Sequence, residues 1–367
     1  MKFEMRFYDK KFNWIGVINL CNYLEFKREL YGVGSFELQV SLNVKGILDL
    51  CKIGNIIVVN GDSRKVGIIR SFRIEDNRQG ATVTINGHTG DGLTKQKIVI
   101  PPNKSQDSNA LGWEKIEGNA ETVIKHFASR NMYNAYDKNR NIENLKMTDN
   151  TNFGKVFPWK ARYTNLAEEL ESICSYAQVG YNIYVDIKNK NWVFDILRGK
   201  DRTKSQKEIS PVVFRTEYSN INEFTYTEDY LDYANTGYAG GSGEDENRLI
   251  YVLNPDNKDM DRFEVFLDCA NSDNITDLMY YAKQKMVDFE PNKTIELLTL
   301  PRTFEFEKDY FLGDKVSVYI DKIGLEIDVI VTSAIETWDR EGGYVCELRL
   351  GDKVPNVFSI KNKEAIR

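Results

Sequence analysis

The stretch GYAGGSGEDENRLI, residues 237–250, is as rich in glycine as the loops that bind phosphate in nucleotide-binding proteins. A Walker-type loop needs Gly-x-x-x-x-Gly-Lys-Ser/Thr, because the lysine must reach the phosphates and the hydroxyl must bind magnesium. Here three acidic residues follow Gly243, and their carboxylates would repel a phosphate. GHTGDGLTK, residues 87–95, also lacks the Walker spacing. We therefore expect no nucleotide site and predict that residues 240–246 form a mobile surface loop.

The sequence lacks the residue sets typical of hydrolytic catalysis. Its two histidines, His88 and His126, are far apart, and no Gly-x-Ser-x-Gly motif is present. We expect His88 in a turn at a strand end and His126 on the solvated side of a helix. Glu168, Glu169 and Glu171 fit the wet face of a helix, and no carboxylate lies in an apolar context that would raise its pKa. We predict that the chain is not an enzyme.

The cysteines and the acidic segments do not form a metal-binding pattern. The five cysteines include no Cys-x-x-Cys pair, and zinc would also need histidines close to them. Residues 254–264, NPDNKDMDRFE, place oxygen ligands at alternate positions but lack the glycine and glutamate spacing of a calcium loop. We predict no metal and no cofactor, and free cysteines in a reducing compartment.

Length and charge exclude further classes of protein. The chain has 367 residues, which suggests two to four domains, and a net charge of −6, with no basic patch of the kind that binds nucleic acid. The first residues, MKFEMRFYDKKFNW, lack the apolar segment of a signal peptide, and no stretch is long and apolar enough to span a bilayer. We expect synthesis in the cytoplasm and no membrane association.

Hydrophobic periodicity predicts a mostly-β chain with a mixed segment inside it. GSFELQVSL, residues 34–42, alternates with a period of two, and further strands follow up to residue 85. Helices are predicted from Asn119 and from Asn165, both good N-caps, with Gly180 ending the second. Another helix is predicted at residues 275–288. We assign a first β domain to residues 1–104, a mixed α+β domain to 105–204 and a second β domain to 205–367, with an insertion at about 237–290.

Two β segments resemble each other. One begins at Gly54-Asn55 and the other at Gly313-Asp314, and each continues with a short strand, a turn and a long strand. We match the ends of the long strands at Ile74-Glu75 and Ile335-Glu336. Any two β-meanders share some of these features, but the common order favours a duplication. The predicted fold class is α+β and mostly β, with two related barrel-like β domains, an inserted mixed domain and a small helical element.

Five stretches of the chain carry a family resemblance. They are YGVGSFELQVSL, GHTGDGLTKQKIVIPP, CSYAQVGYNIYVD, VFDILRGKDRT and the closing FLGDKVSVYIDKIGLEIDVIVTSAIETWDREGGYVCELRLGD. In these stretches the chain resembles the Gp37-like proteins of siphophages. These are tail-tip or baseplate hub proteins, similar to the N-terminal part of tail-associated lysins. The resemblance implies four sub-domains, two of them tube-like barrels, and a homotrimer that closes the tail tube. Longer relatives carry a C-terminal hydrolase or fibre region, which we expect to be missing here or to lie on another polypeptide.

The expected role is a hub in a phage virion or a phage-tail-like particle, made in the host cytoplasm. A trimer of subunits with two similar modules would present six modules, and so adapt a sixfold tube to a threefold spike or fibre. The expected partners are the tail tube or distal tail protein, the spike or fibre protein and the tape measure protein. DNA is expected to pass without being bound specifically, which suits the acidic balance.

The candidate interface elements lie in the two β segments. They are Gly54, Ile56, Ile68, Phe72, Gly313, Val316, Ile327 and Ile330. We expect the segments 54–85 and 313–350 to alternate around a ring and cover each other's strand edges. Ile330, beside Glu326 and Asp328, is expected to contact something beyond its own module.

Two other classes of function remain open. One is a cell-wall hydrolase, which would need a catalytic pocket. The other is a receptor- or sugar-binding baseplate module, for which the mixed segment offers the aromatic residues Trp113, Tyr133, Tyr136 and Trp159.

Overall fold

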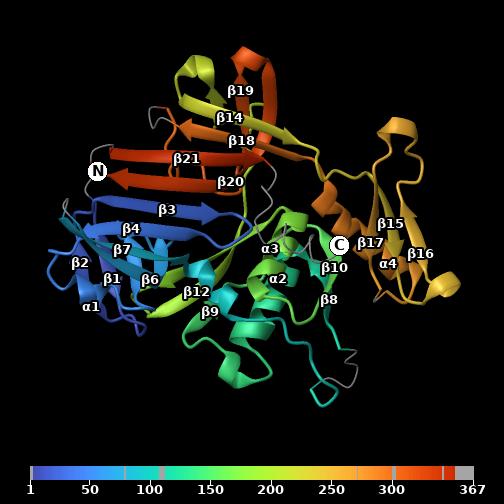
Figure 1. The fold of residues 1–367 in the computed structure, drawn as a ribbon, viewed down its shortest axis with the longest axis horizontal. Coiled ribbons are helices and arrows are strands. Elements are labelled where there is room, and N and C mark those ends of the chain that lie inside the picture. The colour runs from blue at the N-terminus through green and yellow to red at the C-terminus, as the bar shows by residue number, and fades with distance from the viewer. Residues whose placement is uncertain are drawn as a thin grey trace. The chain divides into compact units, whose positions relative to one another are not determined.

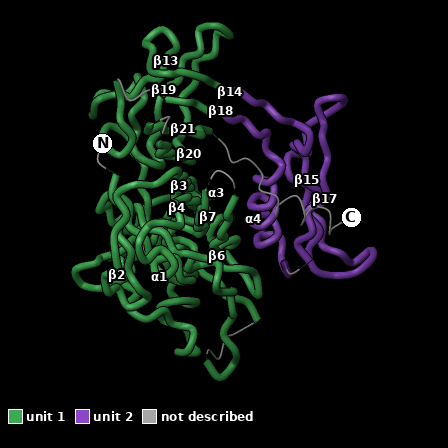
Figure 2. Tube along the Cα trace, turned by 60° about the vertical axis from the view of Figure 1, so that its left-hand side comes forward, with its two compact units in different colours: residues 1–224, 296–351 green, residues 225–295, 352–367 purple. Residues whose placement is uncertain are grey.

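The computed structural model describes residues 3–77, 80–106, 112–270, 272–299, 303–340 and 343–351. The chain forms two compact units (Figure 2). Unit 1 contains the described residues up to 224 and those from 296 to 351, and unit 2 contains residues 225–295. The chain therefore leaves unit 1 once and returns to it once.

Thirteen of the described strands form one large sheet. Its main order is β14-β18-β21-β20-β3-β4-β7-β6-β5-β1-β2, and β13 pairs with β19, which pairs with β20. The strands are β1 Met5–Tyr8, β2 Trp14–Ile18, β3 Tyr23–Glu29, β4 Ser35–Ser41, β5 Ile56–Val59, β6 Val66–Asn77, β7 Gly80–Thr89, β13 Val213–Arg215, β14 Ile221–Asp229, β18 Asn292–Thr299, β19 Lys315–Ile320, β20 Leu325–Asp339 and β21 Gly343–Gly351.

The sheet joins the two ends of the chain. β20 pairs antiparallel with β3, with Glu336 opposite Phe26, and Figure 1 shows the red C-terminal strands beside the blue N-terminal ones. β3 and β4 bury every second side chain, as the period-two pattern predicts. The buried side chains of β3, β4, β5 and β7 meet Trp338 of β20 in one hydrophobic core.

The mixed segment packs on the outside of this first β region. It contains β8 Glu114–Asn119, α2 Ala120–Ala128, β9 Leu145–Met147, β10 Val156–Ala161, α3 Leu166–Ala177, β11 Gly180–Asp186 and β12 Asn191–Leu197. A second core cluster runs from Tyr8, Ile56 and Ile68 of the first β region to Phe127 and Phe194 of the mixed segment. The predicted domain boundaries at 104/105 and 204/205 stay a prediction.

The N-cap residues predicted from the sequence are confirmed for α2 and α3. The side chains of Asn119 and Asn165 cap α2 and α3, accepting bonds from the backbone N–H groups of Thr122 and Ala167. The predicted end of α3 at Gly180 is wrong, because Gln178 ends the helix in the left-handed conformation with φ 55°. Gly180 instead begins β11, where an added Cβ atom would lie 2.4 Å from a backbone oxygen of Leu30.

Unit 2 is a small sheet with a helix on one face. Its strands are β15 Thr236–Gly240, β16 Ile250–Leu253 and β17 Glu264–Asp268, in the order β16-β15-β17, and α4 spans Ile275–Met286. The helix predicted at 275–288 is thus confirmed. The remaining helical elements are α1 Ile47–Leu50 and the short turns η1 Gly90–Gln96, η2 Ser129–Tyr133, η3 Lys138–Arg140, η4 Thr216–Tyr218, η5 Asp245–Asn247, η6 Asp259–Asp261, η7 Val287–Phe289 and η8 Asp321–Ile323.

The mostly-β fold class with a mixed insertion is confirmed. The two β segments share one sheet, and no pairing between described strands closes that sheet into a barrel. Within the described ranges, no helix has the length and apolar character needed to cross a bilayer.

Candidate functional site

The two matched β segments have the same backbone hydrogen bonds. Gly54 and Gly313 both have φ 88°, a conformation that glycine adopts without strain. The N–H of Gly54 donates to Ile69 at 2.8 Å, and the N–H of Gly313 donates to Val331 at 2.9 Å. The carbonyls of the next residues, Asn55 and Asp314, accept from the N–H groups of the same Ile69 and Val331 at 2.9 Å each.

The long strands of the two segments also carry the same irregularity. The register of β6 with β7 shifts between Ile69 and Ser71, and that of β20 with β21 shifts between Val331 and Ser333. Both strands then pair antiparallel with the following strand. We name β5–β7 module 1 and β19–β21 module 2. Their common geometry favours a duplication.

The sequence match of Ile74-Glu75 with Ile335-Glu336 is wrong by one position. The shared hydrogen bonds make Ile69 equivalent to Val331, so Ile74 corresponds to Glu336. Because side chains alternate across a strand, this offset changes the face on which each residue lies. Glu336 is 1% exposed and faces the core side, whereas Glu75 is exposed.

The outer edges of the two long strands differ. In module 2, β3 covers the edge of β20 from Ser333 to Asp339. In module 1, among the strands that the structure describes, residues 70–77 of β6 pair with β7 alone. Both faces of this part of β6 are exposed, including Phe72 at 42% and Ile74 at 45%. Module 1 thus has an open strand edge at the position where module 2 is covered.

The candidate interface residues fall into three groups by exposure. Ile56, Ile68 and Val316 are buried in the core of the subunit, so any part they play in assembly comes from their strands rather than from side-chain contact. Gly54, Gly313, Ile327 and Ile330 are half-buried, and Phe72 is exposed.

Ile330 makes a contact beyond its own module, as its acidic neighbours suggested, and this contact lies within the subunit. It packs against the core cluster that the first β region shares with the mixed segment. The reason lies in the fold, since β20 lies against elements that are more than 130 residues away in sequence.

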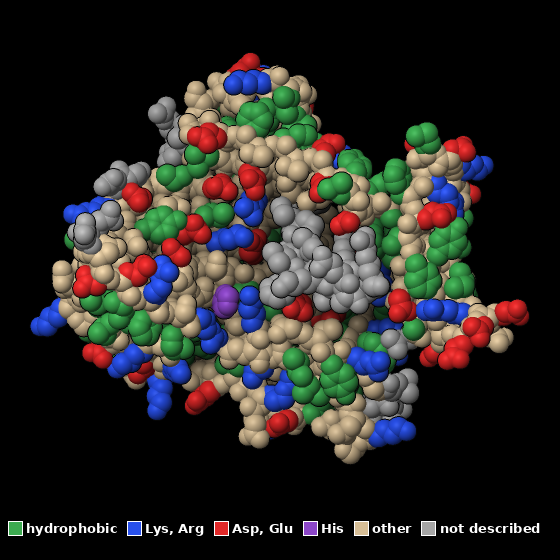
Figure 3. Space-filling view, in the orientation of Figure 1, with side chains coloured by type: hydrophobic (Ala, Val, Ile, Leu, Met, Phe, Trp, Pro, Cys, Tyr) green, Lys and Arg blue, Asp and Glu red, His purple; other side chains and the backbone are tan. Residues whose placement is uncertain are grey.

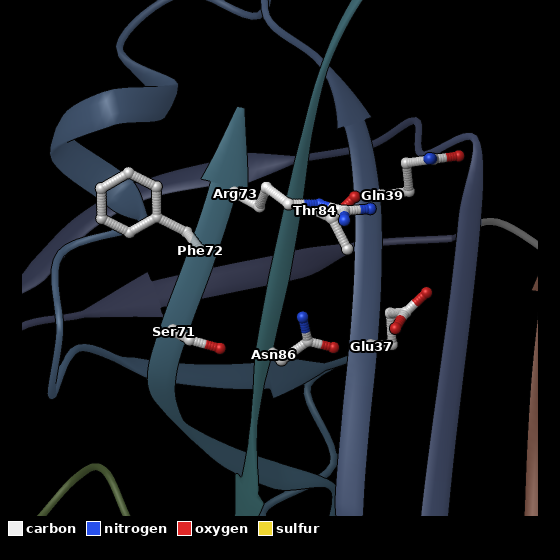
Figure 4. Close-up of a pocket in the computed structure, with 7 residues that line it drawn as sticks. All are labelled: Glu37, Gln39, Ser71, Phe72, Arg73, Thr84 and Asn86. Atoms are coloured by element: carbon white, nitrogen blue, oxygen red, sulfur yellow. The ribbon is translucent and has the colours of Figure 1, made fainter. Parts of the chain in front are cut away.

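One face of the large sheet is polar and continuous across both modules. A row of directly paired residues runs from Thr337 of β20 through Glu25, Glu37 and Asn86 to Ser71 of β6. Figure 4 shows a shallow depression on this face, where Arg73 reaches across the sheet toward Thr84 and Gln39 while Phe72 points away. Glu25 and Glu37 lie directly opposite each other, an arrangement that costs stability because like charges repel.

On the opposite face of the same sheet, four charged side chains form a buried network. Arg28 of β3 binds Glu336 at 2.7 Å and also binds Glu307, and Lys65 binds Glu336 at 2.6 Å and Glu307 at 3.0 Å. Tyr344 donates its hydroxyl to Glu336 at 3.0 Å. Burial raises the pKa of Glu307, but the two cations outweigh it and lower that pKa to about 2. The network connects β3, the start of β6 and β20.

The expectation that no acid lies in an apolar setting is wrong for Asp91. This residue, in the glycine-rich residues 87–95, is 3% exposed. Its carboxylate accepts from the N–H of Ile183 at 2.5 Å and from the hydroxyl of Thr89 at 3.0 Å. Burial raises the pKa of Asp91 to about 7, in spite of these two donors. Asp91 therefore joins η1 to β11.

Several other expectations change with the tertiary contacts. His126 is half-buried and its Nε2 lies 2.5 Å from Oε1 of Glu114, so it is not a freely solvated side chain.

Glu169 accepts a hydrogen bond from Nε1 of Trp159 at 2.6 Å, and burial raises the pKa of Glu169. Trp159 is 8% exposed and belongs to the core, which removes it from the aromatic residues available for a ligand. Trp113 instead lies under Arg162, 4.2 Å from the ring centroid.

The glycine-rich loop of unit 2 is anchored at its base. Gly241 donates to Leu249 at 2.7 Å and Ser242 to Ser272 at 2.9 Å. Gly240 and Gly241 are buried, whereas residues 243–247 are exposed. Mobility therefore remains a prediction for the exposed residues 243–247, whereas the hydrogen bonds of Gly241 and Ser242 hold the base of the loop in place.

The sequence profile of a family described as Siphovirus ReqiPepy6 Gp37-like protein matches residues 4–352. The chain belongs to this family. The resemblance drawn from the sequence motifs is thus confirmed. No curated protein matches the chain significantly.

Solved structures share the fold of the Gp37-like chain. The tail protein from Neisseria meningitidis MC58 is 14% identical, with a TM-score of 0.58 over 96% of this chain and 97% of that one. The 43 kDa tail protein of prophage MuSo2 from Shewanella oneidensis is 11% identical, with a TM-score of 0.60 over 95% and 98%. The prophage tail protein gp18 from Listeria monocytogenes EGD-e is 11% identical, with a TM-score of 0.52 over 100% and 99%. The Gp37-like chain is a phage tail-type structural protein.

Sequence reasoning missed the two features that organise the site of this Gp37-like chain. The first is the open edge of β6, which is recognisable only when β20 is seen to be covered by β3. The second is the buried charge network, whose members Arg28, Lys65, Glu307 and Glu336 are scattered through the sequence. The aliphatic alternation of β20 offered a signal for the second, because Glu336 interrupts an otherwise apolar face.

Proposed function

We propose that the chain is a hub of a phage tail or phage-tail-like particle, and that three copies form a ring at the distal end of the tail tube. The observation that supports this most is the presence of two modules with the same glycine geometry and the same bulge in one subunit. Three copies would present six such modules, which suits a sixfold tube on one side and a threefold spike or fibre on the other.

The open edge of β6 is the proposed contact between copies. Residues 70–76 have no described strand on the side away from β7, so their backbone groups can pair with a strand from a neighbour, as β3 pairs with β20 within the subunit. The exposed Phe72 and Ile74 would be buried in the same contact. Among the candidate interface residues, Phe72 is therefore the one whose side chain takes a direct part.

The polar face of the sheet is the proposed wall of the passage. The opposed pair Glu25 and Glu37 makes this face unfavourable for a polyanion. DNA or a tape measure protein would pass along such a wall without sticking to it. The partners that this role requires are the tube protein, the spike or fibre protein and the tape measure protein.

Cryo-electron microscopy of the particle that contains the chain tests the proposal. We expect three copies around the tail axis, with modules 1 and 2 alternating in a ring. A different number of copies, or modules lying outside the ring, would contradict it.

A variant tests the contact separately. Phe72→Asp should prevent ring assembly while leaving the melting temperature of the subunit unchanged, because this side chain is exposed. Tyr163→Asp is the matched control, since Tyr163 is 66% exposed and lies outside the modules. Normal assembly of the Phe72→Asp variant would exclude β6 as the contact and would leave the hub role to be judged by the microscopy.

A further inference from the structure

Among residues 225–295, the sheet of unit 2 has one face covered by a helix and one face that no described element covers. α4 packs on the first through Leu278, against Ala239 and Leu267, and Figure 1 shows this helix on one side of the strands. Side chains alternate along a strand, so Tyr238 and Phe266 point to the other face. They are direct partners in the register of β15 and β17, so both aromatic side chains extend from this face.

Phe266 reaches over the backbone of the neighbouring strand. A Cβ atom added to Gly240 would come 2.6 Å from Cζ of Phe266 and 2.8 Å from Nε of Arg248. The missing side chain of Gly240 therefore makes room for the ring and the guanidinium group. Arg248 lies 5.1 Å from the ring centroid, yet 53% of Phe266 remains exposed.

Tyr238 is held in a fixed orientation by Arg262. This arginine donates to the hydroxyl of Tyr238 at 2.9 Å and to the carbonyls of Pro255 and Asn257 at 2.8 and 2.7 Å. It also pairs with Glu264. A guanidinium group with this many bonds cannot easily turn toward a new partner, so it fixes the ring rather than binding a ligand.

The charges on this face cancel each other. Arg248 pairs with Asp268 at 3.0 Å, and Arg262 pairs with Glu264 at 2.5 Å. Residues 225–295 as a whole contain fifteen acidic and six basic side chains, a net charge of −9. Figure 3 shows acidic side chains on unit 2 next to hydrophobic ones. A polyanion such as nucleic acid would be repelled by this unit.

We propose that the uncovered face formed by Tyr238, Phe266 and Arg248 binds a neutral carbohydrate chain. A sugar ring has an apolar C–H face that stacks on an aromatic ring, and hydroxyl groups around its rim. On this face the rings are exposed, and the Arg248–Asp268 pair offers donors and acceptors beside them. This inference does not depend on ring assembly by unit 1.

Other occupants fit the face less well. A cationic peptide would compete with Arg248, which already lies over the ring of Phe266. A protein partner needs an area on the order of 800 Å² on each side with a mostly uncharged centre, and here two ion pairs lie beside the two rings.

Saturation-transfer NMR with the full chain tests the proposal. The probes are two neutral oligosaccharides, the tetramers of N-acetylglucosamine and of glucose, together with hexalysine and polyphosphate. We expect transfer to at least one neutral sugar, with a dissociation constant on the order of 1 mM. Phe266→Ala and Tyr238→Ala should each weaken this binding at least about tenfold, which corresponds to about 1.4 kcal/mol.

Further variants separate binding from folding. Phe263→Ala removes a ring that is 47% exposed and packs on Tyr233, and it should leave binding unchanged. Phe266→Trp keeps an aromatic ring and should keep binding, whereas Gly240→Ala should weaken it by displacing Phe266. Failure of both neutral sugars to bind the natural chain overturns the proposal. It is equally overturned if Phe266→Ala binds normally, or if hexalysine or polyphosphate binds in their place.

Discussion

Asp91 is a carboxylate enclosed by unit 1, and it makes the stability of the protein depend on pH. Its pKa is about 7 in the folded chain and 3.8 in the reference state. Below pH 4 both states bind the proton, so the group has no effect. Between about pH 4 and 7 the folded state keeps a proton that the unfolded state has lost, and the free energy of unfolding therefore falls as the pH rises.

Asp91→Asn should remove this dependence. The amide cannot ionise, so the variant should gain stability relative to the natural chain as the pH rises from 4 to 8, by at most about 4 kcal/mol for a shift of about three pKa units. Denaturant titrations at several pH values measure the difference. Asp245→Asn, at the exposed tip of the unit 2 loop, serves as control and should show no such trend. A difference that is constant with pH would mean that Asp91 is ionised in the folded chain.

Glu336 shares two buried cations with Glu307, and its removal should be costly. Glu336→Gln keeps the shape but leaves Arg28 and Lys65 with one carboxylate, and we expect a loss of about 3–5 kcal/mol. Glu75→Gln is the matched control, because the sequence comparison had aligned these two glutamates. Glu75 is exposed, and its substitution should change stability by less than about 0.5 kcal/mol. Equal losses would contradict the register assigned to the modules.

Each of the two modules is preceded by a glycine with φ 88°, Gly54 before β5 and Gly313 before β19. An alanine in this left-handed conformation costs about 1–2 kcal/mol. Gly54→Ala and Gly313→Ala should therefore both destabilise unit 1 by about this amount. At Gly54 the added Cβ atom would displace only the flexible end of Lys10, whereas at Gly313 it would come 3.2 Å from the backbone N of Gly199. Thermal unfolding measures the losses.

Gly32→Ala provides the comparison for these two variants. Gly32 does not have a positive φ, and an added Cβ atom would meet only the side chain of Glu171, at 3.3 Å. It should lose no stability. If Gly54→Ala and Gly313→Ala are as stable as Gly32→Ala, the positive φ of the two glycines does not contribute to the stability of the modules.

At the scale of the whole molecule, the prediction concerns cell-wall hydrolysis. The enclosed Asp91 and the neutralised network around Glu336 are both used to join segments of unit 1. We therefore expect the purified chain to release no dye from labelled peptidoglycan and to give no cleared band in zymography. Lysis that disappears when a single carboxylate is replaced would show a hydrolase and would contradict the structural role.

The sequence by itself determined the features that depend on neighbouring residues. The alternation of Phe36, Leu38 and Val40 marked a half-buried strand, and Asn119 and Asn165 marked the starts of two helices, because a pleated strand and a helix cap need only residues a few positions apart. The Gly-Asn and Gly-Asp pairs at 54 and 313 marked the two modules for the same local reason.

Only the tertiary structure decided the features that join distant parts of the chain. The pairing of β20 with β3 connects residues that lie about 300 positions apart, and it determines which long strand keeps an open edge. The same pairing turns Glu336 toward Arg28, and the packing of β11 on η1 encloses Asp91. Burial and strand register are set by contacts across the whole fold. The residues next to a carboxylate in the sequence therefore do not predict how far it will be desolvated.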